Sequence, residues 1–161
     1  MNAATFHIHP VRNEEEWAQA RAIRARVFIE EQGCPPEEEW DGFDEVSRHF
    51  LGWVGGVPVA TARWRVVPFS ERLVAKLERF AVLPEYRGRG YGRALVRYVM
   101  EDARRAGFST LLIHAQAHLE RFYESLGFRS TGHRFVEAGI PHVQMIWREQ
   151  KSADRPKPIG A

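Results

Sequence analysis

The chain has 161 residues, of which 44% are hydrophobic and 27% charged, so its composition excludes a disordered chain and is typical of one globular domain. Lysine and arginine number 23 against 21 aspartates and glutamates, and this balance excludes a general nucleic-acid or membrane-surface binder. A single cysteine, Cys34, excludes an internal disulfide and a zinc site built from cysteines.

The first half of the chain is predicted to contain two helices and four strands. Asn13 can cap a helix because Glu16 follows three residues later, and apolar side chains then recur at helical spacing until Gly33 and two prolines end the pattern. The pair at 55–56, Gly-Gly, suits the positive φ angles of a two-residue hairpin turn. We expect strands at 5–11, 49–54, 57–67 and 76–82, a helix from 13 to about 33, and a short helix at 37–46.

The second half is predicted to continue with a long helix at about 90–106, which Gly107 ends. A buried strand at 110–115, a helix at 119–126 and strands at 128–135 and 143–148 follow. This order predicts a mostly antiparallel sheet interrupted by helices, an α+β or mixed α/β structure. Residues 151–161, KSADRPKPIGA, are polar and rich in proline, and we expect a disordered tail there.

The segment at 86–92, YRGRGYG, lies where a strand is predicted to give way to a helix. Glycines permit backbone angles and a close approach that a Cβ atom would forbid, and the N–H groups of such a turn, with a helix N-terminus, suit a phosphate. The letters match neither the P-loop pattern nor the dinucleotide spacing G-x-G-x-x-G, but Arg87, Gly90 and Gly92 satisfy R-x-x-G-x-G. A plain tight turn is the alternative.

Two segments carry a resemblance to a known family: LERFAVLPEYRGRGYGRALV at 77–96 and HLERFYESLGF at 118–128. At this spacing they resemble the pyrophosphate-binding motif, and the helix and strand that complete the cofactor site, of the GNAT superfamily of acetyl-CoA-dependent N-acetyltransferases. VFIEEQG near the start and the region that ends in GIPHVQM are similar to small bacterial members of the YjcF and ElaA type. The likeness covers about residues 15–148.

The resemblance implies a single GNAT-like α/β domain over residues 1–150, with a twisted, mixed sheet of six or seven strands and about four flanking helices. It also implies that the turn at 87–92 binds the pyrophosphate of CoA and that the preceding strand contacts the pantetheine arm. Gln116 stands where many relatives have an asparagine on that arm. The implied cofactor-binding residues are Phe80, Ala81, Val82, Arg87, Gly88, Arg89, Gly90, Tyr91, Gly92, Arg93, Gln116 and Tyr123.

Two of these residues are given chemical roles. If the strand before the turn is frayed or bulged, an N–H group, best that of Val82, is free to bond the thioester carbonyl and the oxyanion formed from it. A regular core strand is the alternative. Tyr123 stands where family members place a tyrosine that faces the cofactor sulfur, so its phenol would donate a proton or hydrogen bond to the departing thiolate.

An alkylammonium acceptor must lose a proton before it can attack, because its pKa is about 10.4. Glu78 is the first candidate for the base, since family relatives often carry a glutamate on this strand and half-burial would raise its pKa. An ion pair with Arg79 or Arg63 is the alternative role for Glu78. His142 is the second candidate for the base and Glu137 the third.

The acceptor is expected to be a small-molecule or peptide amine, with no nucleic-acid or membrane partner, no metal, and a homodimer possible. The acidic run at 33–45, GCPPEEEWDGFDE, would line a site for a cationic amine or would be a solvated loop and helix start. The first residues show no basic leader or apolar segment, which predicts a cytoplasmic location. A non-catalytic CoA or acyl-CoA sensor, or an interaction protein of this fold, is the alternative to an enzyme.

Overall fold

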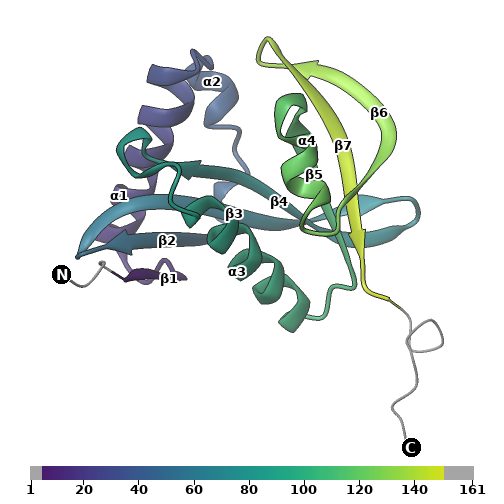
Figure 1. Ribbon diagram of the computed structural model, residues 1–161, viewed down its shortest axis with the longest axis horizontal. Coiled ribbons are helices and arrows are strands. Elements are labelled where there is room, and N and C mark those ends of the chain that lie inside the picture. Colours follow the sequence, from purple (N-terminus) through teal and green to yellow (C-terminus); the bar gives the residue numbers. More distant parts are fainter. Residues whose placement is uncertain (1–4, 151–161) are drawn as a thin grey trace, which may run out of the picture.

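The computed structural model describes residues 5–150, which form a seven-stranded sheet in the order β1-β2-β3-β4-β5-β7-β6 (Figure 1). Neighbouring strands are antiparallel except β4 and β5, which are parallel. The strands are β1 Phe6–Pro10, β2 Arg48–Val54, β3 Val57–Phe69, β4 Arg72–Val82, β5 Thr110–Gln116, β6 Arg129–Glu137 and β7 Ile140–Arg148. This confirms the predicted mixed, mostly antiparallel sheet. The predicted disorder at 151–161 lies outside the described residues.

The helices cover the two faces of the sheet unequally (Figure 1). The α-helices are α1 Glu14–Arg24, α2 Pro36–Glu39, α3 Tyr91–Arg105 and α4 Glu120–Glu124. On one face, α3 and α4 pack their apolar side chains against the larger core. On the other face, α1 and the π-helical segment Ala25–Glu31 pack against a smaller core that includes Leu51 and Ala81. Side chains that alternate along the central strands therefore face two different environments.

The first helix begins as the sequence predicts. The side chain of Asn13 accepts a hydrogen bond from the Glu16 N–H at 2.8 Å, which caps α1. After Arg24 the helix continues as π-helix to Glu31, and Gly33 at φ +74° ends it. The apolar spacing correctly marks a helical segment up to this glycine, but it does not distinguish the wider π-helical turns from α-helix.

Both hairpin turns in the first half use positive φ angles, but only one carries glycine. Gly55 and Gly56 lie at φ +56° and +79°, which confirms the turn predicted there. The hairpin of β3 and β4 turns through Ser70 and Glu71, at φ +49° and +67°. Because neither residue is a glycine, the sequence carries no strong signal for this turn. Both strands are consequently longer than predicted.

The short helix predicted at 37–46 is wrong over most of its length. The structure has only one α-helical turn, α2, and a separate 3-10 turn at Asp44–Val46. Gly42 at φ +84° interrupts the segment between them. The side chain of Glu39 is turned inward and only 1% exposed, so the acidic side chains of this region do not all form the solvated face of a helix.

Candidate active site

The parallel pairing of β4 and β5 stops early. Residues 75–77 of β4 pair with 111–113 of β5, although β4 continues to Val82 and β5 to Gln116. The two strands therefore part beyond residue 77, and backbone groups of β4 that face β5 have no ladder partner there. Such unpaired groups at the centre of a sheet are suited to bonding an extended ligand.

A β-bulge lies where the strands part. Ala81 pairs with Thr61, and Glu78 pairs with Arg63, so Arg79 and Phe80 together stand opposite Ala62 on β3. Arg79 has φ +61°, a left-handed angle that is rare for a residue with a side chain. A bulge, one of the two expected departures from a regular strand, is therefore present. It lies two residues before Val82.

The backbone of Val82 faces the parted strands. The N–H of the next residue, Leu83, donates to Val59 O at 2.9 Å, which places the backbone groups of Leu83 on the β3 side. Successive residues of a strand alternate, so the N–H and C=O of Val82 are directed away from β3, towards β5. The carbonyl accepts a hydrogen bond from Arg87 Nε at 2.9 Å. The N–H of Val82 therefore faces the space between the parted strands.

The glycine turn opens into α3 without a side-chain cap. Gly88 and Gly90 have φ +78° and +83°, so these two positions require glycine for the backbone angle itself. Gly92 has no such angle, and a Cβ atom built there meets nothing within 4 Å. The first-turn N–H groups of α3 are thus open to an anion, at the positive end of a helix of 15 residues.

The three arginines of the turn differ in their contacts. Arg87 forms a bidentate pair with Glu31, at 2.7 and 2.8 Å, which neutralises its charge. Arg89 donates to a backbone carbonyl at 3.3 Å. Arg93 donates to Ser125 Oγ at 2.7 Å. Arg89 and Arg93 therefore keep a charge that no carboxylate in the described residues takes up.

The remaining predicted cofactor residues lie on several elements and do not all face one way. Tyr91 at the start of α3 stacks on Phe6 with ring centroids 4.6 Å apart. Phe80 packs against the α3 side of the sheet, and Ala81 is buried on the α1 side. Gln116, at the end of β5, donates from Nε2 to Gln32 Oε1 at 3.1 Å and so links β5 to the end of the first helix.

Tyr123 lies in α4, only 6% exposed, with its ring against Phe122 and Phe128. Burial raises the pKa of its phenol, so the side chain keeps its proton at neutral pH. A protonated phenol can donate to a thiolate, whereas an ionised one could not.

Glu78 departs from its predicted electrostatics. Burial would raise its pKa, as expected, but the charges of Arg63, Lys76 and Arg65 act more strongly together, and the pKa of Glu78 is lowered. Arg65 Nε donates to one carboxylate oxygen and Arg63 Nη2 donates to the other at 3.3 Å. The expectation of a raised pKa is therefore wrong, and the ion pair with Arg63 that was the alternative is formed. A carboxylate held in this way is a weaker proton acceptor.

His142, on β7, is buried and has a defined tautomer. Its Nδ1 lies 2.7 Å from the carbonyl of Ile140, and a carbonyl can only accept, so Nδ1 carries the proton of the neutral ring. Nε2 then bears the lone pair and lies 3.8 Å from Glu137 Oε2. The second and third candidates for the base are thus brought together on the β6–β7 hairpin.

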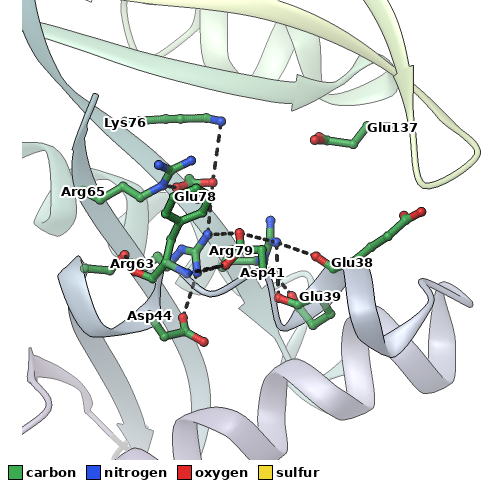
Figure 2. Close-up of polar contacts among 12 residues, drawn as sticks. Glu38, Glu39, Asp41, Asp44, Arg63, Arg65, Lys76, Glu78, Arg79 and Glu137 are labelled. Atoms are coloured by element: carbon green, nitrogen blue, oxygen red, sulfur yellow. Dashed lines mark hydrogen bonds and ion pairs between the residues drawn. The ribbon is translucent and has the colours of Figure 1, made fainter. Parts of the chain in front are cut away.

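The acidic run contributes to a buried ion-pair network, which Figure 2 shows. Asp41 and Asp44 both bond Arg63, which is fully buried, at 2.6 and 2.7 Å, while Glu39 pairs with Arg79 at 2.7 Å. These three carboxylates therefore neither line an open amine site nor form a solvated face. Sequence reasoning missed their arginine partners, which lie about 15 to 40 residues away along the chain.

Among residues 5–150, no group of three or more histidine, cysteine or acidic side chains is arranged to hold a metal ion. No helix in this part of the chain is long and apolar enough to cross a membrane.

Comparison with known proteins agrees with this geometry. Residues 47–149 match the family model described as an acetyltransferase (GNAT) domain. A Bacillus subtilis protein named as an acetyltransferase is 37% identical over 150 residues, which cover 91% of this chain and 99% of that protein. The uncharacterized N-acetyltransferase YjcF of Bacillus subtilis is 35% identical over 84% of this chain and 94% of its own length.

Solved structures share the fold. The crystal structure of Escherichia coli ElaA superposes with a TM-score of 0.78 at 28% identity, over 89% of this chain and all of ElaA. A Bacillus subtilis acetyltransferase in complex with CoA superposes with a TM-score of 0.69 over 91% of this chain and all of that one. Its identity of 16% shows the fold alone.

Proposed function

The chain belongs to the GNAT acetyltransferase family, and on this premise we propose that it transfers the acetyl group of acetyl-CoA directly to a primary amine. One observation supports the proposal above all others: β4 and β5 pair over three residues and then part, directly before the uncapped N-terminus of α3. An extended thioester and its pyrophosphate would need a strand edge and an anion site in this order along the chain.

The cofactor half of the site would be made mostly from backbone. The N–H groups of the turn and of the first turn of α3 would bind the pyrophosphate, and Arg89 and Arg93 would add charge. Arg87, whose charge is taken up by Glu31, would instead hold the end of β4 through the Val82 carbonyl. Gln116 would bond the pantetheine arm. The other cofactor contacts would come from Phe80, Ala81, Gly88, Gly90, Tyr91 and Gly92.

The chemical half needs three groups. The N–H of Val82 would donate to the thioester oxygen as negative charge develops on it. The amine nitrogen attacks the carbonyl carbon, the carbon–sulfur bond breaks, and Tyr123 donates a proton or hydrogen bond to the leaving thiolate. We assign the proton lost by the amine to Nε2 of His142 rather than to Glu78, because the pKa of Glu78 is lowered while the lone pair of His142 is defined by its Nδ1 bond.

Release of CoA as free thiol, measured with the full chain, acetyl-CoA and a broad panel of amines, tests the proposal. Amine-dependent release would support transfer. Tight CoA binding without amine-dependent release would contradict it and would favour the non-catalytic CoA-binding alternative.

A further inference from the structure

We infer that the acceptor carries a carboxylate close to its amine, and that Lys76 and Arg65 bind that carboxylate. The inference rests on the proposed transfer and names the substrate class of the same site. It starts from the sheet face opposite α3 and α4, outside the smaller core on which α1 and the π-helical segment pack. An acceptor would approach the parted strands from this side.

Four polar side chains lie on four neighbouring strands of this face: Arg65, Lys76, His114 and Gln144. We call them the polar row, although the row shifts by two residues between β4 and β5, where Lys76 stands opposite Leu112. Arg65 pairs in register with Lys76, and His114 with Gln144. All four side chains are partly buried, although the neighbouring residues Leu77, Ile113 and Met145 fill the apolar core on the opposite face. Antiparallel sheets often present one polar, solvated face, but these four side chains are partly buried rather than fully solvated, which suits them to bind a polar ligand.

The polar row lies at the point where the strands part. Lys76 belongs to the last three paired residues of β4, and His114 directly follows the last paired residue of β5. A thioester lying between the parted strands would end near this point, with Tyr123 and α4 on the far face. An acceptor on the near face would therefore rest on the polar row while its amine reaches the thioester.

The row is rich in donors. Gln144 donates from Nε2 to His114 Nε2 at 3.3 Å, so His114 carries its own proton on Nδ1. Burial, together with the charge of Lys76, lowers the pKa of His114 to about 4, which leaves it uncharged at neutral pH. His114 therefore adds no second positive charge beside Lys76, and its neutral ring keeps an N–H donor.

The charges connected to this row do not cancel. Continuous ion pairs join five cations to four carboxylates: Arg24, Arg63, Arg65, Lys76 and Arg79 with Glu39, Asp41, Asp44 and Glu78. His49, which adjoins Asp44, has a pKa lowered by burial and adds no charge at neutral pH. With all four carboxylates ionised, one positive charge is in excess; burial raises the pKa of Glu39, and protonation of Glu39 would only add to this excess. A single carboxylate would balance one positive charge, whereas a phosphate monoester carries about −1.5 to −2.

Lys76 differs from the four arginines of this network because no carboxylate oxygen of the described residues lies within hydrogen-bond distance of its amino group. Arg63 makes four hydrogen bonds to carboxylates. Lys76, in contrast, has one ion pair in the described part of the chain, 3.7 Å from Glu78 Oε2, which is longer than a hydrogen bond. Its side chain is 14% exposed. An ammonium with three donors, mostly buried and without a carboxylate at hydrogen-bond distance, is suited to bind an anion.

The opposite wall is acidic. Figure 2 shows the Lys76 amino group and the Glu137 carboxylate directed into the same space from different elements. Glu137 lies beside Nε2 of His142, the proposed proton acceptor. A zwitterionic acceptor, such as a free amino acid, would place its carboxylate at Lys76 and Arg65 and its ammonium towards Glu137 and His142.

The test compares free amino acids with their carboxamides, which keep the shape and lose the charge, and with the decarboxylated amines. With the full chain and acetyl-CoA, we expect kcat/KM for the acid form to exceed that for the amide by at least about 10-fold, the scale of a hydrogen bond to a charged group. Lys76→Met should reduce this ratio by about 10-fold or more. Arg72→Met, which removes an exposed charge from the far end of the same strand, should leave the ratio unchanged.

The acid-to-amide ratio does not depend on how much of a variant is folded, and the wild-type comparison needs no variant. Equal or better use of amides or plain amines, or a ratio that survives Lys76→Met, would overturn the inference and leave the proposed transfer intact. No turnover with an amine of any kind would overturn the proposed transfer, and the inference with it.

Discussion

Among substitutions in the turn at 87–92, Gly92→Ala should best distinguish an effect on cofactor binding from an effect on the free energy of unfolding. Gly92 is the second residue of α3, its φ is not left-handed, and an added Cβ meets no atom within 4 Å. Alanine in a helix is more favourable than glycine by about 1 kcal/mol, so the free energy of unfolding should stay the same or rise by up to that amount. The added methyl group would occupy the open space above the α3 N-terminus.

The cost to the cofactor follows from the bonds made there. Displacing a pyrophosphate oxygen from one or two N–H groups removes hydrogen bonds to a charged group, each contributing about 1.5 to 3 kcal/mol. We therefore expect Kd for CoA to rise by about 10-fold to 100-fold, since about 1.4 kcal/mol corresponds to tenfold. Isothermal titration with CoA and urea unfolding of the same preparation measure the two effects together.

A matched pair at the ends of α3 provides the control. Gly90 and Gly107 have φ +83° and +103°, and an added Cβ meets nothing within 4 Å at either. Alanine at each should cost about 1 to 2 kcal/mol of stability through the left-handed angle. Only Gly90→Ala should weaken CoA binding. If Gly92→Ala and Gly90→Ala both bind CoA as tightly as the parent, or if Gly107→Ala weakens binding equally, the backbone is not the phosphate site.

Three further changes test the chemistry and the ion-pair network. Tyr123→Phe should lower kcat by about 10-fold to 100-fold and leave Kd for CoA nearly unchanged, and equal losses of both would contradict a role at the thiolate. His142→Gln should lower kcat by about 100-fold, and a much smaller effect would return the base to Glu78. Burial would raise the pKa of Asp41, but Arg63, the Phe43 N–H and Arg79 together lower it to about 2, so these contacts contribute about 2 kcal/mol above pH 4 that is lost as the pH falls towards 2. Urea unfolding at pH 6 and pH 2.5 should show this loss in the parent, and a parent-like loss in Asp41→Asn would refute the assignment.

The backbone elements that we propose for cofactor binding could be predicted from the sequence because their signals are local. A glycine turn before a helix, the stop at Gly107 and the hairpin glycines at 55–56 each act through the backbone angles of a few adjacent residues. The bulge at Arg79 and Phe80 could be expected but not placed. Its position depends on which residues of β3 and β4 stand opposite each other, and that register is a property of the folded sheet.

The acceptor half could not be predicted in the same way, because its contacts are long-range. An acidic run is most often solvated, and nothing within 33–45 indicates that Arg24, Arg63 and Arg79 would turn three of its carboxylates inward. One signal was present. Arg63 and Arg65 alternate with apolar residues on β3, as Lys76 and Glu78 do on β4, and paired strands with this pattern place four charges on one face.

The free-energy cost of burying the ion pairs around Arg63 requires an explanation. Burying ion pairs is often no more favourable than packing apolar side chains of the same size, so stability alone does not explain why Arg63 is fully buried. Its one guanidinium bonds Asp41 and Asp44 from the segment after α2 and Glu78 from β4. Arg63 thereby fixes the segment after α2 against β4, next to Arg79 with its left-handed φ angle. Backbone groups would bind the cofactor in any sequence that keeps the turn. Acceptor choice, in contrast, would depend on side chains whose positions this network fixes. If both proposals hold, substitutions at Arg65 and Lys76 would change the acceptor without changing how CoA is bound.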